Sequence, residues 1–128
     1  MSNPRFLLVD EAIQIQADQI ERYGGNLGVR DPNLLSSAVS MPEAGFGDQY
    51  LHSDPFEMAA AYLFHIVQNH PFIDGNKRVG AMAAFTFLKL NGLTLKEKEA
   101  GYESLVLATP EGKMGKAGVA EFLRKYAQ

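Results

Sequence analysis

The chain has 128 residues, of which 46% are hydrophobic and 21% charged, and its formal net charge at pH 7 is −3. This length suffices for one packed core and is short for two, so we expect a single domain over residues 1–128. The negative charge argues against nonspecific nucleic-acid binding, and the absence of cysteine excludes disulfides and thiolate metal sites.

The N-terminal sequence MSNPRFLLVDEAIQ contains only a four-residue apolar run. Such a run is too short for the apolar region of a secretory signal or for a membrane-spanning helix. We therefore expect a soluble, cytoplasmic protein that does not insert into a membrane.

Capping residues and helical periodicity predict two helices in the first third of the chain. The first has Asp10 as its N-cap and ends at the glycines after Tyr23. Its apolar positions fall on one face: Ala12, Ile13, Ala17 and Ile20. The second begins at Asp31 and Pro32, a cap followed by proline at the first helical position, and stops before Pro42. The broken pattern over 43–53 then indicates a surface flap, either a loop or a small hairpin.

Two helices with almost no polar face follow the flap. Asp54 and Pro55 open the first, which continues to His70, and the second ends at Asn91 and Gly92. Small residues in the second helix permit close packing: Gly80, Ala81, Ala83 and Ala84. Such helices are typical of a buried centre.

Two amphipathic helices, roughly 98–108 and 116–126, complete the chain, separated by a glycine-rich turn. No segment shows the regular alternation of a β-strand. The sequence therefore predicts an all-α fold of about six helices, with at most a small β-hairpin flap.

The segment HPFIDGNKR, residues 70–78, carries the densest group of reactive side chains and lies between the two apolar helices. If His70 ends one helix and Asn76 begins the next, core helices hold both ends of the intervening loop. A site built in this way is rigid.

The start of the second apolar helix has the features of a phosphate site. Gly75 lets the backbone approach a ligand, and the amides of Asn76 and Lys77 point out of the helix N-terminus. Such a terminus attracts anions, and Lys77 and Arg78 add two positive charges suited to phosphate oxygens. Cations in a first helical turn are unfavourable unless a bound anion compensates, so we predict phosphate binding here.

Two further side chains add chemistry to this site. A carboxylate beside a polyphosphate commonly holds Mg²⁺, which makes Asp74 the candidate metal ligand. His70 is the nearby group whose ordinary pKa suits proton transfer near neutral pH. The three histidines lack the HxH and HxxxH spacings of zinc sites, so zinc is not expected.

Other notable side chains receive plainer interpretations. We expect His65 to be a satisfied core or groove histidine, His52 to be solvated on the flap, and Arg30 to be structural. Phe46 and Tyr50 either line a substrate groove or simply pack, and the sequence leaves both possibilities open.

The string HPFIDGNKR resembles the signature of the Fic/Doc family, H-x-F-x-D/E-G/A-N-G/K-R. Lys77 stands where most Fic proteins have glycine, and in this the chain is similar to the Doc (death on curing) toxins. The resemblance extends to RYGGNLGVRDPNLLSSAV, to the apolar helix before the motif and to FLKLNG after it, and so covers nearly the whole sequence.

The resemblance implies a compact helical fold whose central helices bracket the motif loop. It also implies transfer of a phosphorus-containing group from ATP to a protein hydroxyl, with ATP and Mg²⁺ as cofactors. The implied roles are a base at His70, a core anchor at Phe72, a Mg²⁺ ligand at Asp74, and phosphate binding at Gly75, Asn76, Lys77 and Arg78.

The chain departs from the Fic pattern for AMP transfer at Lys77 and at Ala81, where typical Fic proteins carry a second arginine. Lysine fills space that the α-phosphate side of a nucleotide would need and adds a charge that can hold phosphates in another order. Transfer of the γ-phosphate, as by Doc-type kinases, is therefore our first expectation. AMP transfer and a non-catalytic helical interaction module are the alternatives.

The resemblance also implies partners. In Doc systems the target is translation elongation factor Tu, and a Phd-like antitoxin neutralises the toxin through its C-terminal segment. The chain has no convincing copy of the S/T-x-x-x-E inhibitory helix that many Fic proteins carry, so we expect inhibition to come from a partner protein. Direct contacts with nucleic acid or a membrane are not expected.

Overall fold

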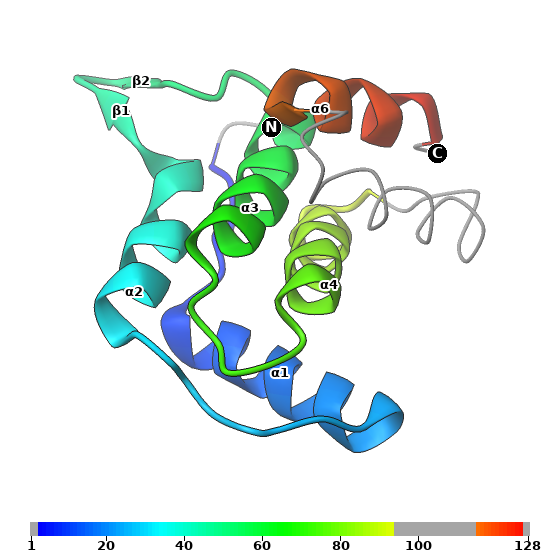
Figure 1. The fold of residues 1–128 in the computed structure, drawn as a ribbon. Coiled ribbons are helices and arrows are strands. Elements are labelled where there is room, and N and C mark those ends of the chain that lie inside the picture. The colour runs from blue at the N-terminus through cyan, green and yellow to red at the C-terminus, as the bar shows by residue number, and fades with distance from the viewer. Residues whose placement is uncertain (1–2, 94–114, 127–128) are drawn as a thin grey trace.

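The computed structural model describes residues 3–93 and 115–126 (Figure 1). These residues form five α-helices, a single 3-10 turn and a two-stranded antiparallel hairpin. The elements are α1 (Val9–Tyr23), α2 (Pro32–Ser40), η1 (Met41–Glu43), β1 (Gly45–Phe46), β2 (Gln49–Tyr50), α3 (Pro55–Asn69), α4 (Asn76–Leu90) and α6 (Gly115–Tyr126). The expected helical class with a small β flap is confirmed. The helix predicted over 98–108 lies outside the described residues.

Helices α2 and α3 begin at the predicted caps. The Asp31 carboxylate accepts hydrogen bonds from the first-turn amides of α2, and the Asp54 carboxylate accepts one from Glu57 N at 2.9 Å. In both helices the next residue is proline, whose missing N–H would have had no helical partner at this position. Each start is therefore specified locally.

Helix α1 begins earlier than expected, and the prediction of an Asp10 cap was wrong. Its N-cap is Leu8, and Asp10 lies in the first helical turn. The Glu11 side chain accepts a hydrogen bond from Leu8 N at 2.8 Å and so satisfies the backbone amide of the N-cap residue. Acidic groups in this turn also interact favourably with the positive end of the helix dipole.

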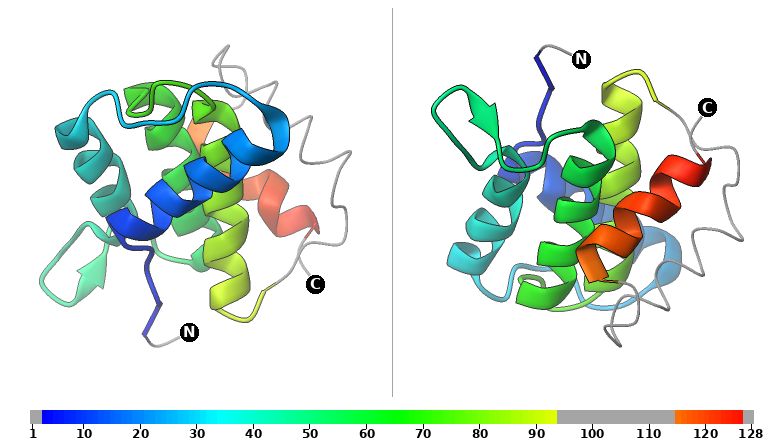
Figure 2. Two further views of the ribbon diagram at one scale, coloured as in Figure 1. Left: turned by 90° about the horizontal axis from the view of Figure 1, so that it is seen from below. Right: turned by 90° about the horizontal axis from the view of Figure 1, so that it is seen from above.

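The buried face of α1 also differs from the predicted apolar stripe. Ile13 is 38% exposed, whereas Gln16 and Gln19 are 1% and 4% exposed. Helix α1 lies across the ends of α3 and α4 where these are joined by their loop (Figure 2, left). Backbone polar groups of that loop need partners, and the buried Gln16 provides one by donating to the Asp74 carbonyl, which an isoleucine could not do.

Helices α3 and α4 form the centre of the fold and lie side by side (Figures 1 and 2). A Cβ atom at Gly80 would lie 3.1 Å from the Leu63 carbonyl oxygen and 3.2 Å from Val67 Cγ2. The two backbones therefore approach closely only because this position has no side chain. The alanines that follow Gly80 on α4 are fully buried, as the small-residue pattern predicts: Ala81, Ala83 and Ala84.

The remaining helices cover this central pair. Helix α2 and helix α6 both contact α3, while α1 contacts α4. The largest fully buried rings come from α3, α4 and the loop that joins them: Tyr62, Phe87 and Phe72. The loop is thus anchored in the same core as the helices.

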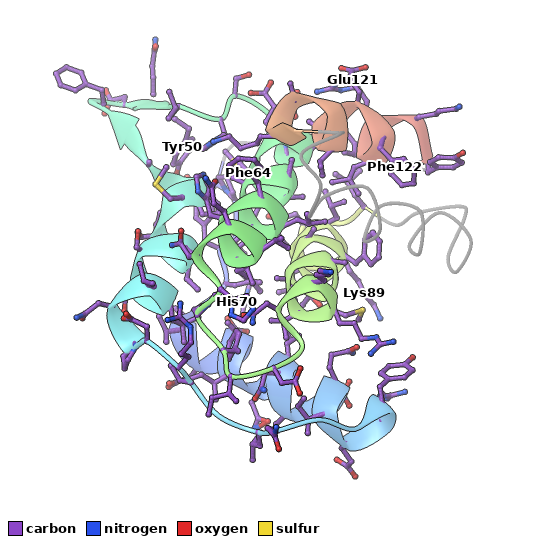
Figure 3. All side chains as sticks on the ribbon, in the orientation of Figure 1. Tyr50, Phe64, His70, Lys89, Glu121 and Phe122 are labelled. Atoms are coloured by element: carbon purple, nitrogen blue, oxygen red, sulfur yellow. The ribbon has the colours of Figure 1, made fainter. Side chains whose placement is uncertain are left out.

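The hairpin lies at the opposite end of α3 from the motif loop. Gly45 pairs with Tyr50 just before the N-terminus of α3, whereas His70 follows its C-terminus, and Figure 3 shows Tyr50 and His70 well apart. The Tyr50 ring packs edge-on against Phe6 with 5.5 Å between centroids, and Phe46 is 94% exposed. Neither aromatic side chain belongs to the motif loop.

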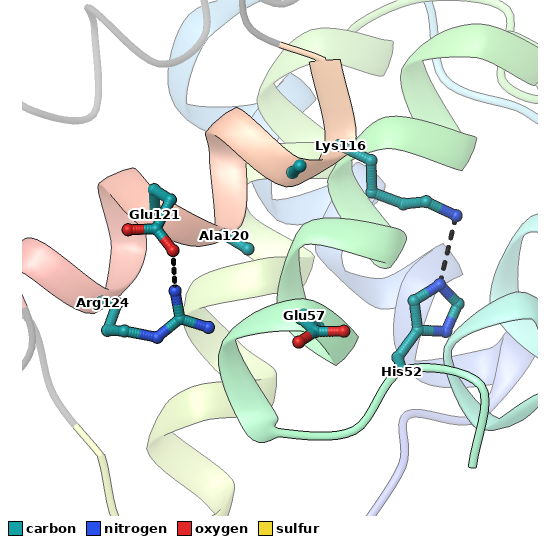
Figure 4. Close-up of a pocket in the computed structure, with 7 residues that line it drawn as sticks. His52, Glu57, Lys116, Ala120, Glu121 and Arg124 are labelled. Carbon is teal, nitrogen blue, oxygen red and sulfur yellow. Dashed lines mark hydrogen bonds and ion pairs between the residues drawn. The ribbon is translucent and has the colours of Figure 1, made fainter.

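Two histidines and a lysine join α6 to the rest of the fold. Lys116 Nζ lies 3.1 Å from Nε2 of both His52 and His65. His52 is 5% exposed, so the expectation of a solvated side chain was wrong, while His65 has a partner as expected. Burial and the positive charge of Lys116 lower the pKa of both rings, that of His65 to about 4. Figure 4 shows His52 and Lys116 in the wall of an open pocket beside α6.

Within residues 3–93 and 115–126, no helix is long and apolar enough to cross a membrane.

The free energy of unfolding should fall as the pH drops from about 6.5 towards 4. The unfolded chain binds more protons in this window, because the pKa of His65 and that of His52 are lowered on folding. The stability is therefore greatest above the pKa that these histidines have in the unfolded chain, and it falls as the pH drops below that value. For His65 we expect a loss on the order of 1–2 kcal/mol, since the ring is partly exposed.

Urea unfolding at pH 7 and at pH 4.5, followed by circular dichroism, measures this loss. His65→Gln provides the matched comparison, because glutamine can accept from Lys116 and does not titrate. A fall of equal size in both proteins would show that His65 does not contribute.

Candidate functional site

The motif loop joins α3 and α4 as the sequence predicts. His70 is the C-cap of α3, and Gly75 is the N-cap of α4. Among the described residues, His70 is the only one other than glycine with positive φ, at φ 52° and ψ 53°. This left-handed conformation costs an L-residue about 1–2 kcal/mol, so surrounding contacts must impose it.

Arg30 supplies contacts that hold His70 in this conformation. Its Nε donates to the His70 carbonyl at 2.7 Å, and its Nη2 donates to the Asn69 carbonyl at 3.0 Å. The backbone amides of Arg30 and Asp31 both donate to the Pro71 carbonyl. The structural role expected of Arg30 is confirmed, and it consists of capping the C-terminus of α3.

The segment between α1 and α2 continues along the motif loop. Val29 and Phe72 form an antiparallel bridge, and Ile73 N donates to Gly28 O at 2.9 Å. Phe72 is fully buried, in agreement with the anchoring role that the resemblance implies. The loop therefore has a backbone partner along its length as well as a helix at each end.

Asn76 connects the start of α4 to His70. Its Oδ1 accepts from Phe72 N at 2.9 Å, and its Nδ2 donates to Phe72 O at 3.0 Å, which fixes the orientation of the amide. The same Nδ2 lies 3.1 Å from His70 Nδ1. An N–H group faces this ring nitrogen, so Nδ1 must accept, and the neutral imidazole carries its proton on Nε2.

Asp74 presents an exposed carboxylate whose position is fixed by backbone amides. Its Oδ1 accepts from Gly75 N at 3.0 Å, and its Oδ2 accepts from Asn26 N at 3.2 Å. Each oxygen retains a further lone pair. The described residues contain no group of three or more potential ligands, so a metal ion at Asp74 would take its other ligands from water and substrate. This donor set fits Mg²⁺, which usually binds one or two carboxylates and keeps several waters.

The N-terminus of α4 lies beside the Asp74 carboxylate, which accepts from Gly75 N. Gly75 provides no side-chain cap, and the first turn contains no acidic residue. The amides of Asn76 and Lys77 have no intrahelical acceptor, and the side chains of Lys77 and Arg78 are exposed. Partial and full positive charges thus combine at an accessible helix start, as an anion site requires.

All the predicted site residues lie together at this loop. They are His70, Asp74, Gly75, Asn76, Lys77 and Arg78. His52 and His65 lie near α6 and are separate from the site.

The structure adds residues that sequence reasoning missed. The Arg78 guanidinium lies 4.4 Å from the centroid of the Tyr23 ring, at the end of α1. The buried Gln16 side chain hydrogen-bonds to the Asn26 and Asp74 carbonyls and to the Gly28 amide. The available signal for Gln16 was a polar residue one turn after Ala12 on the inner face of α1.

Comparisons with known proteins agree with this arrangement. The model of the Fic/DOC family matches residues 6–88. A protein named Toxin Doc from Mycolicibacterium smegmatis is 42% identical over 73 residues, which span 57% of this chain and 56% of that protein. A protein named Protein kinase doc from Escherichia phage P1 is 29% identical over 121 residues, which span 94% of each chain.

The tautomer of His70 is open to direct measurement. Long-range ¹H–¹⁵N NMR at pH 9 should show neutral His70 with its proton on Nε2, because Asn76 donates to Nδ1. Asn76→Ala should remove this preference, and it should lower stability by about 1–3 kcal/mol because the buried Phe72 amide loses its acceptor. A proton on Nδ1 in the unsubstituted protein would contradict the arrangement.

Proposed function

Because this chain belongs to the Fic/Doc family, we propose that it is a Doc-type toxin that acts as a protein kinase. In this proposal it transfers the γ-phosphate of ATP to a hydroxyl side chain of translation elongation factor Tu and so arrests translation. The proposal rests on one observation. In a short loop, His70 and Asp74 lie beside the N-terminus of α4, which has no side-chain cap. The names of the two relatives, one a toxin and one a protein kinase, support it.

Phosphate binding is assigned to the start of α4. The amides of Asn76 and Lys77 donate to phosphate oxygens, and Gly75 leaves room for them because it has no side chain. Lys77 supplies a point charge, and Arg78 supplies a planar group that can donate two parallel hydrogen bonds. Phosphoryl transfer requires chiefly such positioning and charge stabilisation from the protein.

Two positions favour phosphate transfer over AMP transfer. Lys77 occupies the place where a glycine would leave space for the α-phosphate side of a nucleotide. Ala81, at the place of the second Fic arginine, is fully buried between helices, so this position of α4 faces the core. The anion site is therefore confined to the first turn of α4, a geometry that suits one terminal phosphate.

In the transfer step, the acceptor oxygen bonds to the γ-phosphorus, the bond to the bridging oxygen breaks, and ADP leaves. His70 takes the proton of the hydroxyl group. The 3.1 Å contact with Asn76 Nδ2 assigns the acceptor role to His70 Nδ1, which puts the proton of the neutral ring on Nε2. A ring nitrogen with an available lone pair therefore arises only when the contact with Asn76 opens. Asn76 thus influences when His70 can act as the base.

The Asp74 carboxylate would hold Mg²⁺, which when bound neutralises charge on the phosphates. The amides of Gly75 and Asn26 fix the carboxylate in place before any ligand arrives. Preorganisation of this kind lowers the cost of assembling the site.

We further propose that a Phd-like antitoxin neutralises the toxin. The related protein from Mycolicibacterium smegmatis is itself named as a toxin, which supports a toxin–antitoxin pair. The site is exposed at one end of the central helices, where a partner segment can reach it. In this proposal the protein has no membrane or direct nucleic-acid partner, and it acts in the cytoplasm.

Intact-protein mass spectrometry tests the reaction. Incubation of elongation factor Tu with the protein, ATP and Mg²⁺ should add the mass of one phosphate. His70→Asn should reduce the rate by about 10²–10⁴-fold, because asparagine tolerates the left-handed conformation and cannot serve as the base. Expression of this variant should no longer arrest growth.

The controls separate the alternatives. Asp74→Asn should weaken the reaction strongly, whereas Asp48→Asn, an exposed carboxylate in the hairpin, should not. Addition of a whole adenylate would establish AMP transfer instead. Growth arrest that persists in the His70→Asn variant would exclude both enzymatic mechanisms and leave a non-catalytic interaction module.

A further inference from the structure

We infer that Gln16 is a positioning residue that sets the place of the Asp74 carboxylate, and hence the affinity of the site for Mg²⁺-bound nucleotide. This inference rests on the proposed function for its ligand and on three hydrogen bonds for its geometry. Gln16 Nε2 donates to Asp74 O and to Asn26 O, both at 3.2 Å, and its Oε1 accepts from Gly28 N at 3.3 Å. A single side chain of α1 therefore joins the motif loop to the α1–α2 segment.

The position of Gln16 makes these bonds hard to replace. The Gln16 side chain is 1% exposed, and the three hydrogen bonds that it makes are partly buried. An apolar side chain of equal length would leave two carbonyls and one amide without this partner. A glutamate would accept from Gly28 N, but it offers no donor to the carbonyls of Asp74 and Asn26.

The bonds of Gln16 act on the Asp74 carboxylate through the segment that they hold. Gln16 binds the carbonyl of Asn26, and the amide of Asn26 donates to Asp74 Oδ2. Contact here is close: a Cβ atom at Gly25 would lie 2.8 Å from the same Oδ2. A small shift of the α1–α2 segment must therefore displace or release the carboxylate.

Gln19 provides a matched control on the same helix. It is 4% exposed, but its Nε2 is 3.5 Å from the neighbouring Asp18, and its buried Oε1 has no hydrogen-bond partner within residues 3–93 and 115–126. Gln19→Met thus removes a buried amide of the same size that forms no hydrogen bond to residues 70–78. Gln16→Met and Gln16→Glu remove the bonds to it.

Amide hydrogen exchange tests the geometry without any ligand. In Gln16→Met, the amides of Asn26 and Gly28 should exchange about tenfold faster or more, since each loses a direct or neighbouring hydrogen bond. Gln19→Met should leave both amides at the rate of the unsubstituted protein. Equal protection of these amides in all three proteins would overturn the inference.

Titration calorimetry with ATP, in Mg²⁺ and in EDTA, tests the role. We expect Gln16→Met and Gln16→Glu to reduce the gain in ATP affinity that Mg²⁺ gives by about tenfold, with little change in EDTA. A purely structural residue would alter both conditions together or neither, and either result would overturn the inference. If the unsubstituted protein bound no ATP at all, the proposed function would fail first, and the inference about nucleotide affinity would fail with it.

Discussion

The left-handed turn at His70 is the constraint on which the site depends. An L-residue does not adopt this conformation without support, and Arg30 provides support by binding the last two carbonyls of the turn. The turn directs the chain out of α3 and into a loop that returns to α4 within five residues. His70, the Asp74 carboxylate and the N-terminus of α4 are neighbours because this loop is so short.

The closeness of α3 and α4 allows so short a loop. Gly80 lets the two backbones meet near the Leu63 carbonyl, and Phe72 anchors the loop in the core that they share. The same closeness leaves the polar backbone of the loop at the edge of an apolar core. From α1, the buried Gln16 side chain binds backbone groups of this loop and of the α1–α2 segment.

Local signals in the sequence predicted most helix boundaries and the whole motif. Asp31 and Asp54, each followed by proline, marked helix starts because capping depends on only a few neighbouring residues. The errors concerned the cap and the buried face of α1 and the burial of His52. The N-cap of α1 is Leu8, whose amide donates to Glu11 only three residues further along the chain. His52 is buried for a reason that lies far away in the sequence, because α6 brings Lys116 against it.

The sequence by itself determined which groups meet at the motif, since residues 70–78 are contiguous and two apolar helices flank them. It also determined the concentration of positive charge at the start of α4, which follows from helix polarity and from Lys77 and Arg78. Only the tertiary structure decided how these groups are held. Arg30 lies 40 residues from the carbonyl that it caps, and Gln16 lies 58 residues from Asp74. No local pattern encodes such pairs, because their partners are backbone atoms whose positions exist only once the helices have packed.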